Sequence, residues 1–303
     1  MPSTALRPIP WVRVSETTQG RSVDRPFQGR KLAIATKHEK ESVLGPLLTA
    51  ALGVSWVVPH GLDTDSLGTF SGEILRNLDP LATARKKCLL AMEITGADLA
   101  VASEGSFGPH PTLHFVPAGD EIVMLMDRKQ NAEIWVRHIT TETNFQARTV
   151  RTTSELLAFA EEILFPTHGI IIRRSATDYE MMEKGVMDWQ TLSQTFDRIR
   201  KEHGSVFVES DMRAMYNPTR MRTIATAAGK LVEKILVSCP TCNHPGFGPT
   251  EAIRGLPCAL CGLPTQSILA HVSVCSKCGN RSEIPFPLGK EKEDPRYCDF
   301  CNP

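Results

Sequence analysis

The sequence has no long apolar run and no excess of charge of either sign. Its 303 residues contain 34 Lys and Arg against 34 Asp and Glu. A formally neutral chain has no broad positive field for nucleic acid or an acidic membrane, so we expect neither as a partner. No apolar run approaches the roughly 20 residues of a membrane span. The N-terminus also lacks the apolar core of a secretory signal, so we expect a cytoplasmic protein.

Cysteine is almost absent outside paired motifs. Of nine cysteines, only Cys88 stands apart, in an apolar helical pattern that predicts a small buried side chain. The other eight form four C-x-x-C pairs, which in a cytosolic chain indicate a metal rather than disulfides. The pairs are Cys239/Cys242, Cys258/Cys261, Cys275/Cys278 and Cys298/Cys301.

The four pairs predict two structural zinc sites. A C-x-x-C turn presents two thiolates, and two such turns complete a tetrahedral site that leaves no open position for a substrate. Fifteen residues separate the first pair from the second and nineteen the third from the fourth, close to zinc-ribbon spacing. Sequential pairing is therefore the simplest arrangement. Crossed pairing, first with third, stays open, as does an iron-sulfur cluster.

Three regions differ in composition. Residues 1–28 are rich in Pro, Ser, Thr and Arg and predict a flexible tail, and residues 238–303 form the cysteine-rich module. Between them, 29–237 alternates apolar strands with helical patterns, which predicts an α/β domain with a mixed sheet flanked by helices. In this domain the strand "ADLAVAS" is expected to end in a turn at "SEGSFGPHP".

Polar side chains follow each of the first three predicted strands. Cations at a strand-to-helix turn suit a phosphate, and carboxylates in a loop suit Mg²⁺. Because ligands of open α/β sheets bind at the carboxyl ends of the strands, we expect these groups to converge. Solvated turns remain the alternative for each. The residues are Thr36, Lys37 and Lys40 after the first strand, Asp63, Asp65 and Glu73 after the second, and Glu104 after the third.

The order of these motifs resembles the inosine triphosphate pyrophosphatases and Maf-like proteins. The segments that carry the resemblance are "ATKHEK", "DTDSLGTF", "LATARKKCLLA", "ASEGSF" and "NPTRMRTIATAAGKL". The whole folded chain more closely resembles a bacterial family of unknown function, marked by "GTFSGE", "SEGSFGPHP", "DMRAMYNPTRM" and a tail ending in "YCDFCNP".

The pyrophosphatase resemblance implies a metal-dependent phosphohydrolase acting on a nucleotide or a related phosphorylated small molecule. Water would attack the triphosphate with the help of Mg²⁺ or Mn²⁺. Glu73 and Glu104, with Asp63 or Asp65, would bind the metal or act as general base. Thr36 would contact the phosphates, and the cations Lys37, Lys40, Lys86 and Arg220 would neutralise them.

Other roles remain open at this point. Glu209, Asp211 and Arg213 again follow a strand and could join the site, and His110 lies between two prolines beside Glu104. The α/β part could instead bind a nucleotide or an anion without catalysis. In that case the zinc module would mediate a protein or nucleic-acid interaction. In an enzyme, the module would be structural or would mediate homo-oligomerisation.

Overall fold

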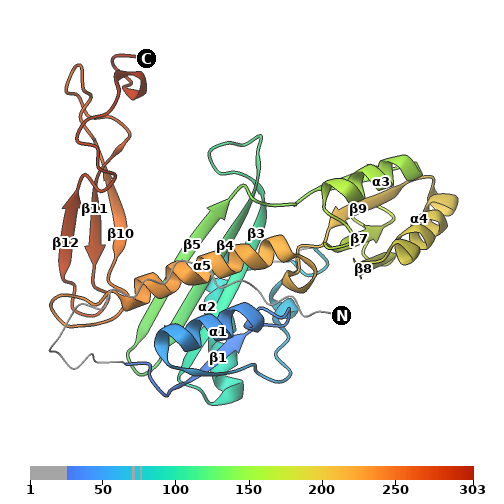
Figure 1. The fold of residues 1–303 in the computed structure, drawn as a ribbon, viewed down its shortest axis with the longest axis horizontal. Coiled ribbons are helices and arrows are strands. Elements are labelled where there is room, and N and C mark those ends of the chain that lie inside the picture. The colour runs from blue at the N-terminus through green and yellow to red at the C-terminus, as the bar shows by residue number, and fades with distance from the viewer. Residues whose placement is uncertain (1–25, 70–71, 76) are drawn as a thin grey trace, which may run out of the picture.

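The computed structural model describes residues 26–69, 72–75 and 77–303. It is a mixed α/β protein with a mixed sheet flanked by helices, as the sequence predicts (Figure 1). The expected tail lies outside the described residues except for 26–28, and there Phe27 is buried in the core. Phe70 and Ser71 of "GTFSGE" also lie outside the described residues.

A five-stranded sheet in the order β2-β1-β3-β4-β5 forms the centre of the molecule. β1 is parallel to β2 and β3, whereas β4 pairs antiparallel with β3 and with β5. This change of direction makes the sheet mixed. The strands are β1 (Lys31–Ala35), β2 (Ser55–Val57), β3 (Leu99–Pro109), β4 (Pro117–Asp127) and β5 (Ala132–Thr140).

Helices cover both faces of this sheet. α1 (Glu41–Leu52) and the long α5 (Pro218–Leu236) bury one core cluster with Leu99, Val101 and Val123. α2 (Pro80–Thr95) buries another with Ala100, Ala102 and Met124 on the opposite face. Alternate residues of β3 therefore face different helices.

The expected turn at "SEGSFGPHP" is wrong for most of its length. β3 continues to Pro109 and stays in register with β4, from Leu99 opposite Asp127 to Pro109 opposite Pro117. The chain reverses only at 110–116. Glycine and proline suggested a turn, but pairing with β4 satisfies the backbone and overrides that local preference.

A second, antiparallel sheet has the order β6-β9-β7-β8. Its strands pack with α3 and α4 around a separate core cluster that includes Phe159, Phe196 and Val208. α5 then returns the chain to β4 and β5 of the first sheet (Figure 1). The elements are β6 (Ala147–Val150), α3 (Thr153–Glu162), β7 (Ile170–Arg173), β8 (Met182–Val186), α4 (Trp189–His203) and β9 (Val206–Ser210).

The cysteine-rich module is an antiparallel meander of β10 (Pro249–Arg254), β11 (Ile268–Val274) and β12 (Arg281–Pro285). It stands beside the far end of α5 in Figure 1, with the C-terminus at its tip. Near its base, Gly246 approaches Ile134 of β5, so this end of the module lies against the first sheet.

Candidate functional site

A small pocket lies where β1 ends and α1 begins. It brings together five of the side chains singled out in the sequence. They come from the segment between β1 and α1, from the loop after β2, and from β3. Its volume is about 20 Å³, which gives room for about one water molecule. The predicted residues among those that line it are Thr36, Lys37, Lys40, Asp65 and Glu104.

Glu104 forms a buried ion pair with Lys87 of α2. Both side chains are almost inaccessible to solvent. The predicted phosphate ligand Lys86 is exposed instead and does not line the pocket. Lys87 lies three residues after Ala84 and four before Ala91, and both alanines are buried, so helical periodicity turns Lys87 inward.

Lys40 lies inside the protein at the start of α1. Its Nζ donates to the hydroxyl of Ser103 at 2.9 Å and to the Ser103 carbonyl oxygen at 3.3 Å. Burial lowers its pKa to about 7, with further lowering by Arg220 and Lys87, while Glu121 and Glu104 oppose the shift. The proton of this amine is therefore weakly held, and a nearby anion would strengthen its binding.

The outer rim of the pocket consists of exposed ion pairs. Lys37 lies 2.7 Å from Asp63 and 2.9 Å from Asp65, and His38 Nε2 lies 3.1 Å from Asp65. The hydrogen bond with His38 and that with Lys37 lower the pKa of Asp65. Asp63 contacts the rim residue Lys37 but does not line the pocket.

Arg220 lies on the other face of the sheet. It is 2% exposed and pairs with Glu121 of β4 at 3.3 Å. Gly105 makes this arrangement possible, because a Cβ there would lie 2.4 Å from a Glu121 oxygen. Arg220 acts on Lys40 through its charge rather than by lining the pocket.

Glu73 turns away from the pocket towards the second sheet. It forms an ion pair with Lys184 of β8, and Gly72 lies against the hydroxyl of Tyr179. Lys184 in turn interacts electrostatically with Asp211 and Asp65. The loop that carries Asp63, Asp65 and Glu73 thus connects the two sheets.

The other polar candidates have structural partners. The ring of His110 accepts hydrogen bonds from the backbone of Thr112 and Leu113 and shapes the β3–β4 turn. Asp211 is fully buried and accepts from Arg213 and from the Gly185 amide. Glu209 pairs with Arg173.

The lining of the pocket contains one more cation than carboxylates when Lys40 is protonated. Lys37, Lys40 and Lys87 line it together with the carboxylates of Asp65 and Glu104.

Lys87 and Glu121 were not singled out in the sequence as partners of this site. The burial of Lys87 could have been read from the helix period, but the pairing of Glu121 required the register of β3 with β4.

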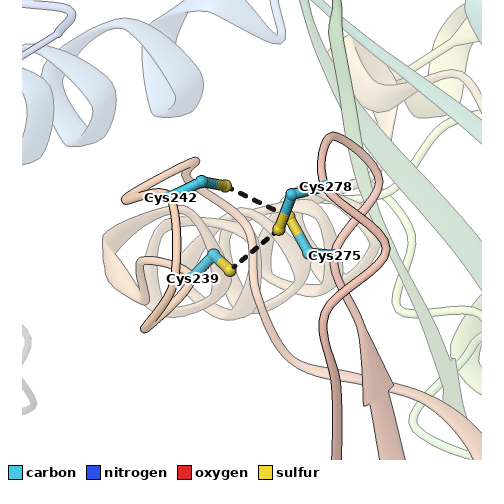
Figure 2. Close-up of side chains that lie close together, drawn as sticks. All are labelled: Cys239, Cys242, Cys275 and Cys278. Carbon is cyan, nitrogen blue, oxygen red and sulfur yellow. Dashed lines mark hydrogen bonds between the residues drawn. The ribbon is translucent and has the colours of Figure 1, made fainter.

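The cysteines form two clusters of four that could hold zinc. In the cluster of Figure 2, the sulfurs of Cys239 and Cys278 lie 3.7 Å apart and those of Cys242 and Cys275 3.6 Å apart. Sulfurs at about 2.3 Å from a tetrahedral zinc lie about 3.8 Å from one another. In the second cluster, the sulfurs of Cys258 and Cys301 lie 3.8 Å apart and those of Cys261 and Cys298 lie 3.7 Å apart.

The simplest expectation, sequential pairing, is wrong. The first pair joins the third and the second joins the fourth. The reason lies in the meander: each strand carries the chain to the opposite end of the module, so consecutive pairs alternate between its ends (Figure 1). Spacing along the sequence cannot show this, because both pairings use the same intervals.

None of the described helices combines the length and the hydropathy needed to span a membrane.

Comparison with known proteins places the chain in a family. A search of curated proteins found no match. Residues 87–303 match a family model described as a domain of unknown function, DUF6671. Since this match spans most of the chain, including Glu104 and all eight paired cysteines, the protein belongs to the DUF6671 family.

Proposed function

We propose that the protein is a metal-dependent phosphohydrolase acting on a nucleotide or a related phosphorylated small molecule. The observation that carries this proposal is the convergence of Lys37, Lys40 and Lys87 with Glu104 in one pocket at the end of β1. Cations and a carboxylate at a strand-to-helix turn are what phosphate binding and water activation need.

The residues present fit a magnesium or manganese ion that arrives with its substrate. Mg²⁺ takes one or two protein carboxylates and completes its shell with water and substrate phosphates. Asp65 lines this pocket and would supply such a carboxylate, which leaves Glu104 of the same pocket to act as base. Within the described ranges, the clusters able to hold a metal by protein ligands alone consist of cysteines. When bound, the ion would neutralise phosphate charge and activate water.

The side chains of the pocket divide the remaining work. Lys37 is exposed and can turn from Asp63 and Asp65 towards a phosphate, which enlarges the small pocket. Lys40 supplies a second, buried cation. Lys87 compensates the charge of Glu104, so the carboxylate is available at a buried position to take a proton from the attacking water.

The choice of a nucleotide rests on the order of motifs. "ATKHEK", "DTDSLGTF" and "ASEGSF" follow the order found in the inosine triphosphate pyrophosphatases. On this basis we propose a nucleoside triphosphate as the substrate and pyrophosphate as a product. Glu73 and Arg220, assigned by the same resemblance, would act from outside the pocket.

The test is turnover of a nucleotide panel by the purified protein with Mg²⁺ or Mn²⁺. Release of pyrophosphate or phosphate is expected, and Glu104→Gln should lower kcat by about 10²-fold or more. Glu93→Gln, on the exposed face of α2, is the matched control and should retain the wild-type rate. Binding without turnover of any nucleotide would instead favour a non-catalytic binder, and an unchanged rate in Glu104→Gln would contradict the assigned base.

We further propose that each cysteine cluster holds a structural zinc ion. Sulfur separations of 3.6 to 3.8 Å match one tetrahedral ion. An iron-sulfur cube would bind each sulfur to a different iron and hold the sulfurs further apart. Four thiolates fill the coordination shell, so these ions would stabilise the module rather than bind substrate.

A further inference from the structure

A larger hollow lies on the same sheet, next to the pocket of Glu104. Its volume is about 240 Å³. Most of its lining comes from the last residues of β3, the first residues of β4 and the last residues of β5. All of these are paired, so strand pairing rather than a loop sets the shape of the hollow. Its floor consists of Ser106, Gly108, Ala118, Asp120, Arg137 and Ile139.

The strand register places this floor on the face that carries Glu104. Ser106 pairs with Asp120, which pairs with Ile139, and Gly108 pairs with Ala118. Directly paired residues point to the same face, and so do residues two apart along a strand. Ser106 therefore follows Glu104 on one face at about 7 Å along β3.

Small residues form part of the floor and leave space above it. Gly108 has no side chain, and a Cβ built there would meet no atom within 4 Å. Ala118 opposite adds a single methyl group. Pro109 and Pro111 form part of the wall, and proline has no backbone N–H that would need a partner. The surface offered to a ligand thus places the apolar atoms of Gly108, Ala118 and Ile139 beside the polar side chains of Ser106, Asp120 and Arg137.

At one end of the hollow, Arg137 and Asp120 form a bidentate ion pair. Arg137 donates from Nε and Nη2 to Asp120, at 2.9 and 2.5 Å. A guanidinium has five N–H groups, and Nη1 takes no part in these bonds to Asp120. Arg137 and Asp120 thus place donor and acceptor groups beside the apolar atoms of Gly108, Ala118 and Ile139, a combination that orients a ring with polar edge atoms.

We propose that this hollow binds a flat, uncharged heterocyclic ring of the nucleobase type, carried by the ligand whose phosphates bind beside Glu104. The phosphate half of this proposal rests on the proposed function. A volume of 240 Å³ lies below the roughly 300–1,000 Å³ of sites for drug-sized ligands, so it suits one ring system. The step of about 7 Å between Glu104 and Ser106 leaves the length of a sugar between ring and phosphates.

Filling the hollow tests the proposal. Gly108→Leu adds a side chain where the structure has open space, so the fold should be kept. Gly229→Leu, at a position of α5 that also has open space and lines neither pocket, is the matched control. Each variant and the wild type are titrated by calorimetry with tripolyphosphate and with nucleoside triphosphates, and their zinc content and melting temperatures are compared.

We expect wild type and Gly229→Leu to bind one or more nucleoside triphosphates at least about tenfold more tightly than tripolyphosphate. Gly108→Leu should bind tripolyphosphate normally but lose this preference. Equal affinities for both ligands in wild type, or a preference that survives Gly108→Leu, would overturn the proposal.

A nucleoside without phosphate separates the two proposals. Failure of wild type to bind tripolyphosphate would contradict the phosphate site alone. In that event, the ring site in the hollow is tested separately. A nucleoside is added to the protein, and the NMR signals of the Gly108 and Ala118 amides are followed. Shifts confined to these strands, and absent in Gly108→Leu, support it, whereas unshifted signals at millimolar nucleoside overturn it.

Discussion

The amine of Lys40 donates a hydrogen bond to the hydroxyl of Ser103 across 2.9 Å, joining the start of α1 to β3 inside the protein. Burial and the neighbouring cations Arg220 and Lys87 lower the pKa of Lys40 to about 7, from 10.5 for the free side chain. Both protonation states of this buried amine are therefore populated near neutral pH.

Anion binding should therefore weaken as the pH rises through 7. Below that pH Lys40 is protonated and attracts a phosphate, and above it the amine is neutral. A bound anion raises the pKa of Lys40, so binding takes up a proton near neutral pH. We expect the affinity for tripolyphosphate to fall between pH 6 and pH 8 by about tenfold for each pH unit at most, as measured by calorimetry in buffers of different ionisation enthalpy.

Lys40→Met is the control for this pH dependence. It keeps most of the buried volume but has no proton to lose, so its affinity should be weaker than wild type at pH 6 and nearly independent of pH apart from titration of the ligand itself. A variant that reproduces the wild-type profile would show that another group controls binding.

The ion pair of Lys87 with Glu104 should be sensitive to removal of one partner. Lys87→Met leaves the Glu104 carboxylate buried without its counter-charge, which typically costs about 3–5 kcal/mol. The double variant Lys87→Met/Glu104→Gln removes both charges and should recover much of that stability. Urea unfolding at pH 7 measures these differences.

Lys86→Met provides the matched control in the same helix turn. Lys86 is exposed, so its replacement should change the free energy of unfolding by no more than about 0.5 kcal/mol. Equal destabilisation by the two single variants would contradict the inward orientation of Lys87.

Comparison of these two lysines shows what the sequence could and could not predict. Apolar spacing predicted α2 and its buried face, including Cys88, which is fully buried. The helix period also places Lys87 on this face, but a lysine is seldom buried without a partner, so the period alone does not predict its burial. Its partner Glu104 lies on a different strand, and their contact depends on how α2 crosses β3, which local pattern does not define.

The same reasoning applies to the rest of the site. Polar residues after strands predicted the meeting of Thr36, Lys37 and Asp65, because parallel strands end at a common edge. They could not predict that Glu73 would pair with Lys184 of the second sheet. Nor could they predict that β3 would continue through "SEGSFGP", since the strand partner that extends it follows later in the chain.

Gly105 should tolerate no side chain. A Cβ at this position would lie 2.4 Å from Glu121 Oε2 and 2.8 Å from Arg220 Nη2. Because both of these side chains are buried and hold each other, neither can move away at little cost. We expect Gly105→Ala to lower the free energy of unfolding by about 1–3 kcal/mol, measured by urea denaturation.

Gly229→Ala is the comparison for this change. A Cβ at Gly229 meets no atom within 4 Å, and alanine favours a helix over glycine by about 1 kcal/mol. This variant should therefore be slightly more stable than wild type. If both alanine variants were neutral or stabilising, the close approach of Glu121 and Arg220 to β3 would be contradicted.

Crossed pairing of the cysteines can be tested by counting zinc in double variants. Cys242 and Cys275 belong to one cluster, whereas Cys242 and Cys261 belong to different clusters. Cys242→Ser/Cys275→Ser should therefore keep one tightly bound zinc, while Cys242→Ser/Cys261→Ser should weaken both sites, because each would retain three thiolates. Sequential pairing predicts the reverse.

The zinc content per chain, measured by plasma mass spectrometry after dialysis against a chelator, distinguishes the two pairings. Cys88→Ser is the control. It should keep the wild-type zinc content, because Cys88 lies in the core beside Met124.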